Sequence, residues 1–144
     1  MPAMSNYLEN KTIDATLRGQ VFPTIANIYI ALFTVAPTAA GGGTEVTGGS
    51  YARATVAATL ANWAGTQGAG TTVASSGTTG QTSNNGTITF PTPTVAWGTV
   101  VAMGMFDAAT AGNLLYFGNL SASQVVGVGN AVYYNPATLT LTLS

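Results

Sequence analysis

Alternation of apolar and polar residues is clearest at the end of the chain, in ATLTLTLS (residues 137–144). There Leu139, Leu141 and Leu143 alternate with threonines, which is typical of an antiparallel strand with one buried face. A second pattern, in ANIYIALF (residues 26–33), is apolar or aromatic at nearly every position. Such a run predicts a strand that is buried on both faces. Both patterns indicate a β-sheet protein.

Short apolar runs separated by turn residues continue through the rest of the chain. Residues 37–50 have the composition of turns and loops. Further strands are predicted at residues 51–60, 86–91, 95–106, 113–120 and 130–135. The run 95–106 is expected to bend at Gly98 or Gly104 and to form a hairpin with 113–120. About seven short strands with glycine-rich turns predict a mainly β fold, an antiparallel β-sandwich or jelly roll.

One helix is predicted near the start of the chain, within residues 4–19. Asn6 is followed three positions later by Glu9, a spacing typical of an N-cap with an acidic residue in the first turn. Gly19 fits the position just past the helix end. The sequence therefore predicts one short N-terminal helix or arm, followed by strands, in a single β domain over residues 1–144.

The surface of this helix suggests two kinds of contact. Asp14 and Arg18 are four residues apart, so their side chains can form an ion pair on the helix surface. Tyr7, Ile13 and Leu17 fall on one broad side of the helix. We expect this side to dock onto the sheet.

Residues 64–86 contain almost only Gly, Thr, Ser, Gln, Ala and Asn. Such a composition offers too little apolar surface to form a core. It predicts a long loop that is mobile or is ordered by a partner.

Charged side chains make up only 5% of the 144 residues, against about 25% in typical globular domains. Because charge spread over a surface keeps proteins apart, this composition favours a surface covered by other protein, and we expect a homo-oligomer. Three Lys and Arg residues are too few for a basic nucleic-acid groove. The apolar runs are far shorter than the ~20 residues that a membrane helix requires. We expect neither nucleic acid nor membrane among the partners.

The absence of histidine and cysteine removes most catalytic arrangements, including Ser-His-Asp and Cys-His sets. A zinc site would need carboxylates alone, which is rare. The four acids, Glu9, Asp14, Glu45 and Asp107, are scattered along the chain. A facing Glu45–Asp107 pair, which a glycosidase would need, stays open, although neither residue lies in a recognisable catalytic motif. We expect no enzyme activity, no cofactor and no metal ion.

Asp107 lies between two apolar runs, in GMFDAATAGNLLYFG (residues 104–118). With Thr110 and Asn113 as neutral donors it could bind a calcium ion, but such a site usually has several acids. An aspartate at a strand end can also accept hydrogen bonds from backbone N–H groups a few residues later, and Gly112 can adopt positive φ. We predict that Asp107 and Gly112 stabilise a turn.

Two tryptophans and six tyrosines could form a sugar-binding platform, or they could pack in the core and at interfaces, which is the commoner use. Neighbouring side chains of a strand face opposite sides, so one of Tyr133 and Tyr134 is expected in the core and the other towards solvent or a partner. As partner-contact residues we predict Tyr7, Arg18, Arg53 and Tyr134.

Five blocks of the sequence together resemble a known family. They are MSNYLENKTIDATLRG (4–19), IYIALFTVAPT (28–38), GTEVTGGSYARATV (43–56), ITFPTPTVAWGTVVAMGMFDAATAGNLLYFGNL (88–120) and ATLTLTLS (137–144). In this order the blocks resemble a family of small tailed-bacteriophage virion proteins, and they cover most of the chain. Residues 64–86 depart from that pattern, because this stretch is longer here.

The resemblance implies a virion structural protein. Small β-sandwich proteins of this kind serve as capsid decoration or cement proteins, often as trimers, and others form parts of tails and fibres. Because the chain is a short single domain without a coiled coil or fibre repeat, we expect a cement protein on the capsid exterior, a homotrimer that bridges major capsid protein subunits. The alternative is a tail or fibre component, with or without binding of a receptor glycan. A lectin-like receptor binder and an enzyme stay open as further classes.

Overall fold

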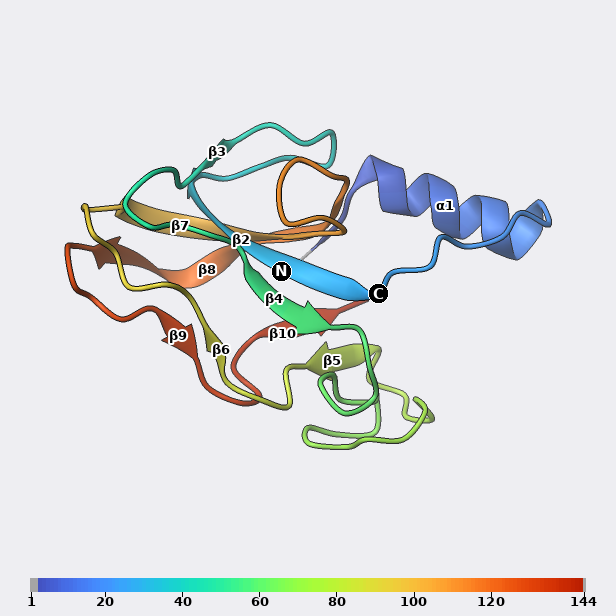
Figure 1. Cartoon of the computed structure of the whole chain (residues 1–144). Coiled ribbons are helices and arrows are strands. Elements are labelled where there is room, and N and C mark those ends of the chain that lie inside the picture. The colour runs from blue at the N-terminus through green and yellow to red at the C-terminus, as the bar shows by residue number, and fades with distance from the viewer. Residues whose placement is uncertain (1–2, 144) are drawn as a thin grey trace.

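The computed structural model describes residues 3–143, and strands with one helix make up its regular structure (Figure 1). The elements are β1 Ala3–Met4, α1 Asn6–Leu17, β2 Asn27–Val35, β3 Thr44–Glu45, β4 Ala54–Ala57, β5 Gln81–Ser83, β6 Ile88–Thr89, β7 Gly98–Phe106, β8 Leu114–Val126, β9 Tyr133–Tyr134 and β10 Thr140–Thr142. All strand pairs are antiparallel. The prediction of a mainly β, antiparallel fold with one short N-terminal helix is confirmed.

The largest sheet has the order β1-β8-β7-β2-β3, and β4 also pairs with β2. Strands β7 and β8 form the predicted hairpin. Two smaller sheets, β10 with β5 and β6 with β9, form the second layer (Figure 1). The register of β7 on β8 shifts between Val100 and Ala102, whose partners are Gln124 and Asn119. A second shift lies between Met105 and Phe106, next to Gly104. The bend expected at Gly98 or Gly104 stays a prediction.

The main core lies between the large sheet and the two smaller ones. It joins Ile30 and Leu32 of β2 and Val100 of β7 with Ile88 of β6, and Leu139, just before β10, packs against it. The opposite face of β2 also packs, because Ala31 and Phe33 form a second cluster with Ala102 of β7. Burial on both faces of this strand agrees with its continuous apolar sequence.

Helix α1 begins one residue earlier than the sequence suggested, because Ser5 is the N-cap in place of Asn6. The Ser5 backbone is extended and its hydroxyl accepts a hydrogen bond from the Leu8 amide at 3.2 Å. The same hydroxyl donates to the Leu114 carbonyl of β8, which ties the cap to the sheet. Gly19 follows the helix with a φ of 69°, the left-handed conformation expected of a residue that ends a helix.

The prediction that Tyr7, Ile13 and Leu17 dock onto the sheet is wrong. Ile13 is 49% and Leu17 80% exposed, and Leu8 is the buried residue of the helix. At about 100° per residue, Leu8 and Leu17 lie on opposite sides. The helix therefore contacts β8 near its first turn and then extends away from the sheet (Figure 1).

Residues 64–86, predicted as a loop that is mobile or ordered by a partner, contain β5 and are hydrogen-bonded to other parts of the chain. The Thr66 hydroxyl accepts a hydrogen bond from the Gly77 amide at 3.0 Å, and the Gln67 carboxamide bonds to both Ala74 and Ser76. Asn84 is buried and bonds to Asn135 and Leu139 of the C-terminal segment. Hydrogen bonds between polar side chains and backbone thus order this stretch without an apolar core of its own.

Candidate functional site

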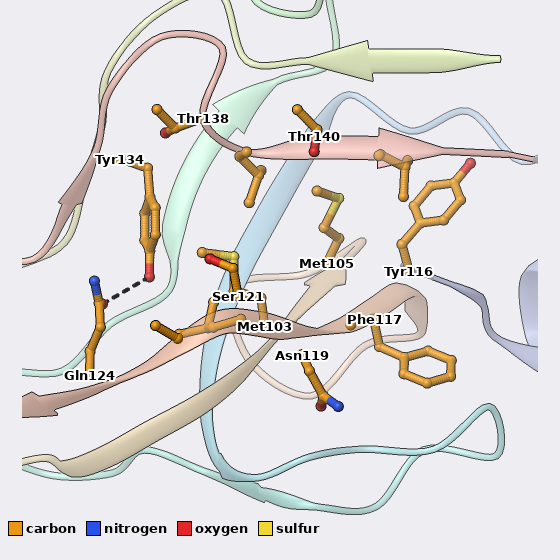
Figure 2. A pocket seen from close by; sticks show the side chains of 15 residues that line it. Met103, Met105, Tyr116, Phe117, Asn119, Ser121, Gln124, Tyr134, Thr138 and Thr140 are labelled. Carbon is orange, nitrogen blue, oxygen red and sulfur yellow. Dashed lines mark hydrogen bonds between the residues drawn. The ribbon is translucent and has the colours of Figure 1, made fainter. Parts of the chain in front are cut away.

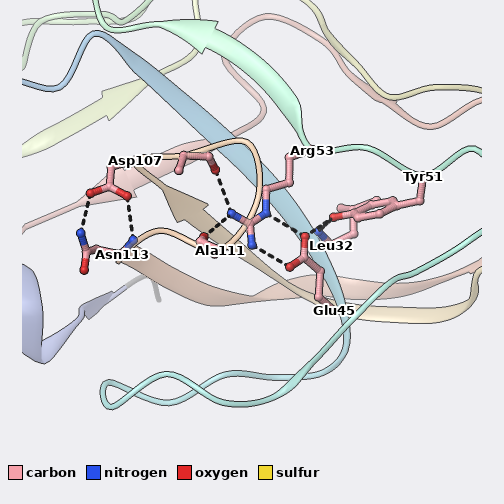
Figure 3. Close-up of polar contacts among 8 residues, drawn as sticks. Leu32, Glu45, Tyr51, Arg53, Asp107, Ala111 and Asn113 are labelled. Carbon is pink, nitrogen blue, oxygen red and sulfur yellow. Dashed lines mark hydrogen bonds and ion pairs between the residues drawn. The ribbon is translucent and has the colours of Figure 1, made fainter.

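Glu45, Tyr51 and Arg53 form a polar cluster that joins β3 to the following segment (Figure 3). Arg53 binds both carboxylate oxygens of Glu45, with Nε–Oε1 and Nη2–Oε2 distances of 2.8 Å. The Tyr51 hydroxyl donates to Glu45 Oε1 and accepts from the Leu32 amide, each at 2.9 Å. Burial, with the Glu45 carboxylate as a further cause, raises the pKa of Tyr51. The cluster therefore holds a neutral tyrosine beside a paired carboxylate.

Arg53 also binds the turn between β7 and β8. Its Nη1 donates to the carbonyl oxygens of Ala108 and Ala111 at 2.9 Å (Figure 3). Its guanidinium carbon lies 3.7 Å from the centre of the Phe106 ring, a cation–π contact. Only 6% of the Arg53 side chain is exposed. Arg53 thus makes its contacts within its own chain. Little of its side chain stays exposed for the partner contact that we predicted.

Asp107 lies in this turn and engages Asn113. Its two carboxylate oxygens accept hydrogen bonds from the Asn113 backbone amide at 2.7 Å and from the side-chain amide at 2.8 Å (Figure 3). Gly112 has a φ of 74°, and a Cβ added there would lie 2.7 Å from Asp107 Oδ1. Glu45 and Asp107 therefore bond to different donors, and they do not form the facing pair that a glycosidase would need.

A groove of about 510 Å³ runs along β8, between this strand and the segment that leads from β9 into β10. Met103 and Met105 of β7 form its floor, between Ser121 of β8 and Thr140 of β10 (Figure 2). This volume falls in the range of about 300–1,000 Å³ that is typical of ligand sites. Among residues 3–143, no charged side chain lines the groove.

Tyrosines border the groove at both ends (Figure 2). At one end the Tyr134 hydroxyl donates to Gln124 Oε1 at 3.3 Å, and burial raises the pKa of Tyr134 to about 12. At the other end lies Tyr116, whose pKa burial also raises. Tyr134 is thus a wall of the groove and packs against Phe90, whereas its neighbour Tyr133 is 53% exposed.

The groove lies beside an unpaired length of β8. Strand β1 pairs with β8 only through Ala3–Phe117 and Met4–Tyr116. In the part of the chain that the structure describes, residues 118–125 have no strand on that edge, and β10 pairs with β5 alone. Unpaired strand edges present free N–H and C=O groups to a partner. The groove therefore combines an apolar floor with backbone hydrogen-bonding groups.

The other two predicted contact residues, Tyr7 and Arg18, lie on the projecting helix. Arg18 pairs with Asp14 at 3.1 Å as predicted and is 71% exposed. Tyr7 is partly exposed, with the Lys11 ammonium 5.8 Å from its ring centre. The four predicted contact residues thus occupy three separate places: the helix, the groove and the Arg53 cluster.

The groove was missed in the sequence because its floor and walls come from distant strands. The sequence itself carries no signal of the groove, since Leu120 and Ala122 alternate with polar residues in NLSASQ (residues 119–124), as they do in an ordinary half-buried strand. Within residues 3–143, no three acidic side chains come together as a possible metal site. In that same part of the chain, no helix has the length and apolar character needed to cross a membrane.

Comparison with known proteins identifies the chain's relatives. A family model described as "Podophage GP4 fiber I protein gp80" matches residues 3–142. A search of curated proteins found no relative. The match includes every helix and strand described above and agrees with the resemblance to phage virion structural proteins. The chain therefore belongs to the Gp80 family of podophage fibre proteins.

Proposed function

We propose that this chain is a non-enzymatic structural subunit of the tail or fibre apparatus of a bacteriophage. The observation that carries this proposal is the match of residues 3–142 to a fibre protein family. The antiparallel β fold and the scarcity of charge, 5% of residues, support a subunit whose surface is largely covered by other protein.

The family favours a fibre over the capsid cement protein that we expected from the sequence. That expectation rested on the absence of a coiled coil and of a fibre repeat within the chain. A single domain can still build an elongated structure when several copies assemble head to tail. The proposed location is thus the tail or a fibre, and a capsid exterior position is the competing one.

The polar groups support a structural role. Glu45 is bound by Arg53 and Tyr51, and Asp107 is bound by Asn113. Each carboxylate thereby connects two parts of the chain through hydrogen bonds. A catalytic acid or base has to reach the proton that it transfers, and these two carboxylates face groups of their own chain.

Fractionation of virions tests this proposal. Particles are sheared, the tails and fibres are separated from the filled heads, and the chain is quantified in each fraction by peptide mass spectrometry. We expect the chain to follow the tail and fibre fraction, in a constant ratio to other tail proteins. Its recovery with the heads, in a ratio to the major capsid protein, would instead support a cement protein.

A further inference from the structure

The groove along β8 is an opening between the two layers of the fold. Met103 and Met105 belong to the main core, and their partners on β8 are Gly118 and Tyr116. Directly opposed residues of an antiparallel pair project to the same face of a sheet. Gly118 therefore leaves space beside the methionines, and residues 138–141 form the opposite wall (Figure 2).

A bulge in β8 shapes this groove. Between Val100 and Ala102, β7 has one residue, whereas their partners on β8, Gln124 and Asn119, are separated by residues 120–123. Three of these four bulge residues, 120–122, line the groove. Bulges re-aim the side chains of a strand and are common beside active sites. The pairing of the sheet is thus irregular at the place where the groove opens.

The polar side chains at the rim of the groove are uncharged and include both donors and acceptors. Gln124 accepts a hydrogen bond from the Tyr134 hydroxyl through Oε1 at 3.3 Å, so this bond does not use the N–H groups of the carboxamide. Ser121 and Thr140 are exposed on facing walls (Figure 2). Each hydroxyl provides one donor and two acceptor lone pairs.

Aromatic rings accompany these polar groups, because Tyr116 and Tyr134 lie at the two ends of the groove (Figure 2). Both residues are partly buried, and the Tyr134 ring packs edge-on against Phe90 with 6.3 Å between the ring centres. Tyrosine combines an apolar ring with a polar hydroxyl. A held ring beside a carboxamide, Tyr134 beside Gln124, is the arrangement that the sugar-binding platform considered from the sequence would need.

We propose that the groove along β8 binds a neutral oligosaccharide. A sugar ring presents C–H groups on its faces and hydroxyl groups around its edge, and each hydroxyl can both donate and accept a hydrogen bond. The C–H faces would pack on the methionine floor and the tyrosine rings. The hydroxyl groups would bond to Gln124, Ser121 and Thr140.

The lining of the groove favours this ligand over two others. An acidic ligand would need a cation, and no Lys or Arg of the described residues lines the groove. A purely apolar ligand would cover the amide and hydroxyl groups of the rim without giving them partners, which is costly. The site goes beyond the structural role proposed above and does not depend on it.

A glycan array of neutral and acidic oligosaccharides, probed with the full chain, tests the proposal. The neutral oligosaccharide that binds most strongly is then titrated into isotope-labelled chain, and the amide signals are followed by NMR. Gln124→Glu and Ser121→Glu each place a carboxylate in the groove. Gln20→Glu and Ser123→Glu, at exposed residues that do not line the groove, are the matched controls. Circular dichroism confirms that each variant is folded.

We expect a neutral oligosaccharide to bind the wild type and to shift the amide signals of β8 and of residues 138–141. Each groove variant should bind it roughly tenfold more weakly, the scale of a lost hydrogen-bonding partner, and both controls should bind it as the wild type does. No binding of a neutral glycan, a preference for acidic glycans, signal shifts elsewhere, or equal affinity of groove variants and controls would each overturn the proposal. Fractionation of virions measures only where the chain lies, so the two proposals fail separately.

Discussion

Arg53 joins three parts of the protein that are far apart in the sequence. Its guanidinium binds Glu45 of β3, two carbonyl oxygens of the β7–β8 turn and the face of the Phe106 ring. The Arg53 side chain, which makes all of these contacts, is almost fully buried. A planar group with five donors can satisfy several acceptors at once, which a lysine cannot do in this position.

Replacement of Arg53 should destabilise the fold strongly. Arg53→Met leaves the Glu45 carboxylate without its cation and frees two turn carbonyls, so we expect a loss of about 3 kcal/mol in the free energy of unfolding. Arg18→Met is the control, because its ion pair with Asp14 is exposed and should contribute less than about 0.5 kcal/mol. Urea unfolding measures both. Similar losses for the two variants would contradict a central role for Arg53.

Asp107→Asn should weaken the β7–β8 turn without abolishing any reaction. The variant keeps one acceptor oxygen for Asn113 but replaces the other by an amide, so we expect a cost of about 1 kcal/mol. Thermal unfolding followed by circular dichroism gives the value, with Asp14→Asn on the exposed helix surface as a comparison. A variant as stable as the wild type would show that the turn does not depend on this carboxylate.

Tyr134 should make the fold sensitive to alkaline pH. Burial raises its pKa from 10.0 to about 12, so the folded state holds the phenolic proton more tightly than the unfolded state does. This contribution to stability is complete below pH 10 and is lost as the pH rises towards 12. The free energy of unfolding, measured with urea, should fall less steeply over this pH window for Tyr134→Phe than for the wild type. Tyr133→Phe should follow the wild type. Identical profiles for all three proteins would contradict the assignment.

At the scale of elements, residues 64–86 illustrate how a polar stretch can be ordered. Its Thr and Gln side chains bond to backbone groups of the same segment, as Thr66 does with Gly77. Close packing accompanies these bonds, since a Cβ added to Gly77 would lie 2.2 Å from the Thr66 carbonyl oxygen. No larger residue fits there without movement of the backbone.

Gly77→Ala should therefore loosen this segment while leaving the sheets intact. Hydrogen exchange followed by mass spectrometry should detect faster exchange in peptides that cover residues 64–80 and unchanged exchange in β2 and β7. Gly86→Ala is the matched control, because a Cβ added to Gly86 meets nothing within 4 Å. Fast exchange of residues 64–80 already in the wild type would mean that the segment is mobile after all.

The strands were predictable because their pattern is local. The run 26–33 indicated β2, and 95–120 indicated the β7–β8 hairpin, since apolar periodicity and turn residues lie within each stretch. The order of residues 64–86 was not predictable, because it depends on hydrogen bonds between residues far apart in the sequence, such as Thr82 and Ala64. The groove was missed for the same reason, as its floor on β7 and its rim near β10 meet only in the folded chain.

At the scale of the whole molecule, charge is concentrated in the projecting helix. Glu9, Lys11, Asp14 and Arg18 lie there, while the Glu45–Arg53 pair is internal. The helix can thus supply ion pairs that choose a partner, since charges add selectivity more than affinity. The groove along β8, by contrast, is lined by no charged side chain among the described residues. This division suits a subunit that is added to an assembly in one orientation.

The central claim is that the chain is a structural part of the tail or fibre, and a cryo-EM map of the whole virion tests it most directly. We predict that the two-layer fold fits density on the tail or a fibre, in repeated copies, with each helix α1 against a neighbouring subunit. Fit of the same fold to density on the capsid shell, between subunits of the major capsid protein, would contradict the claim and would support a cement protein.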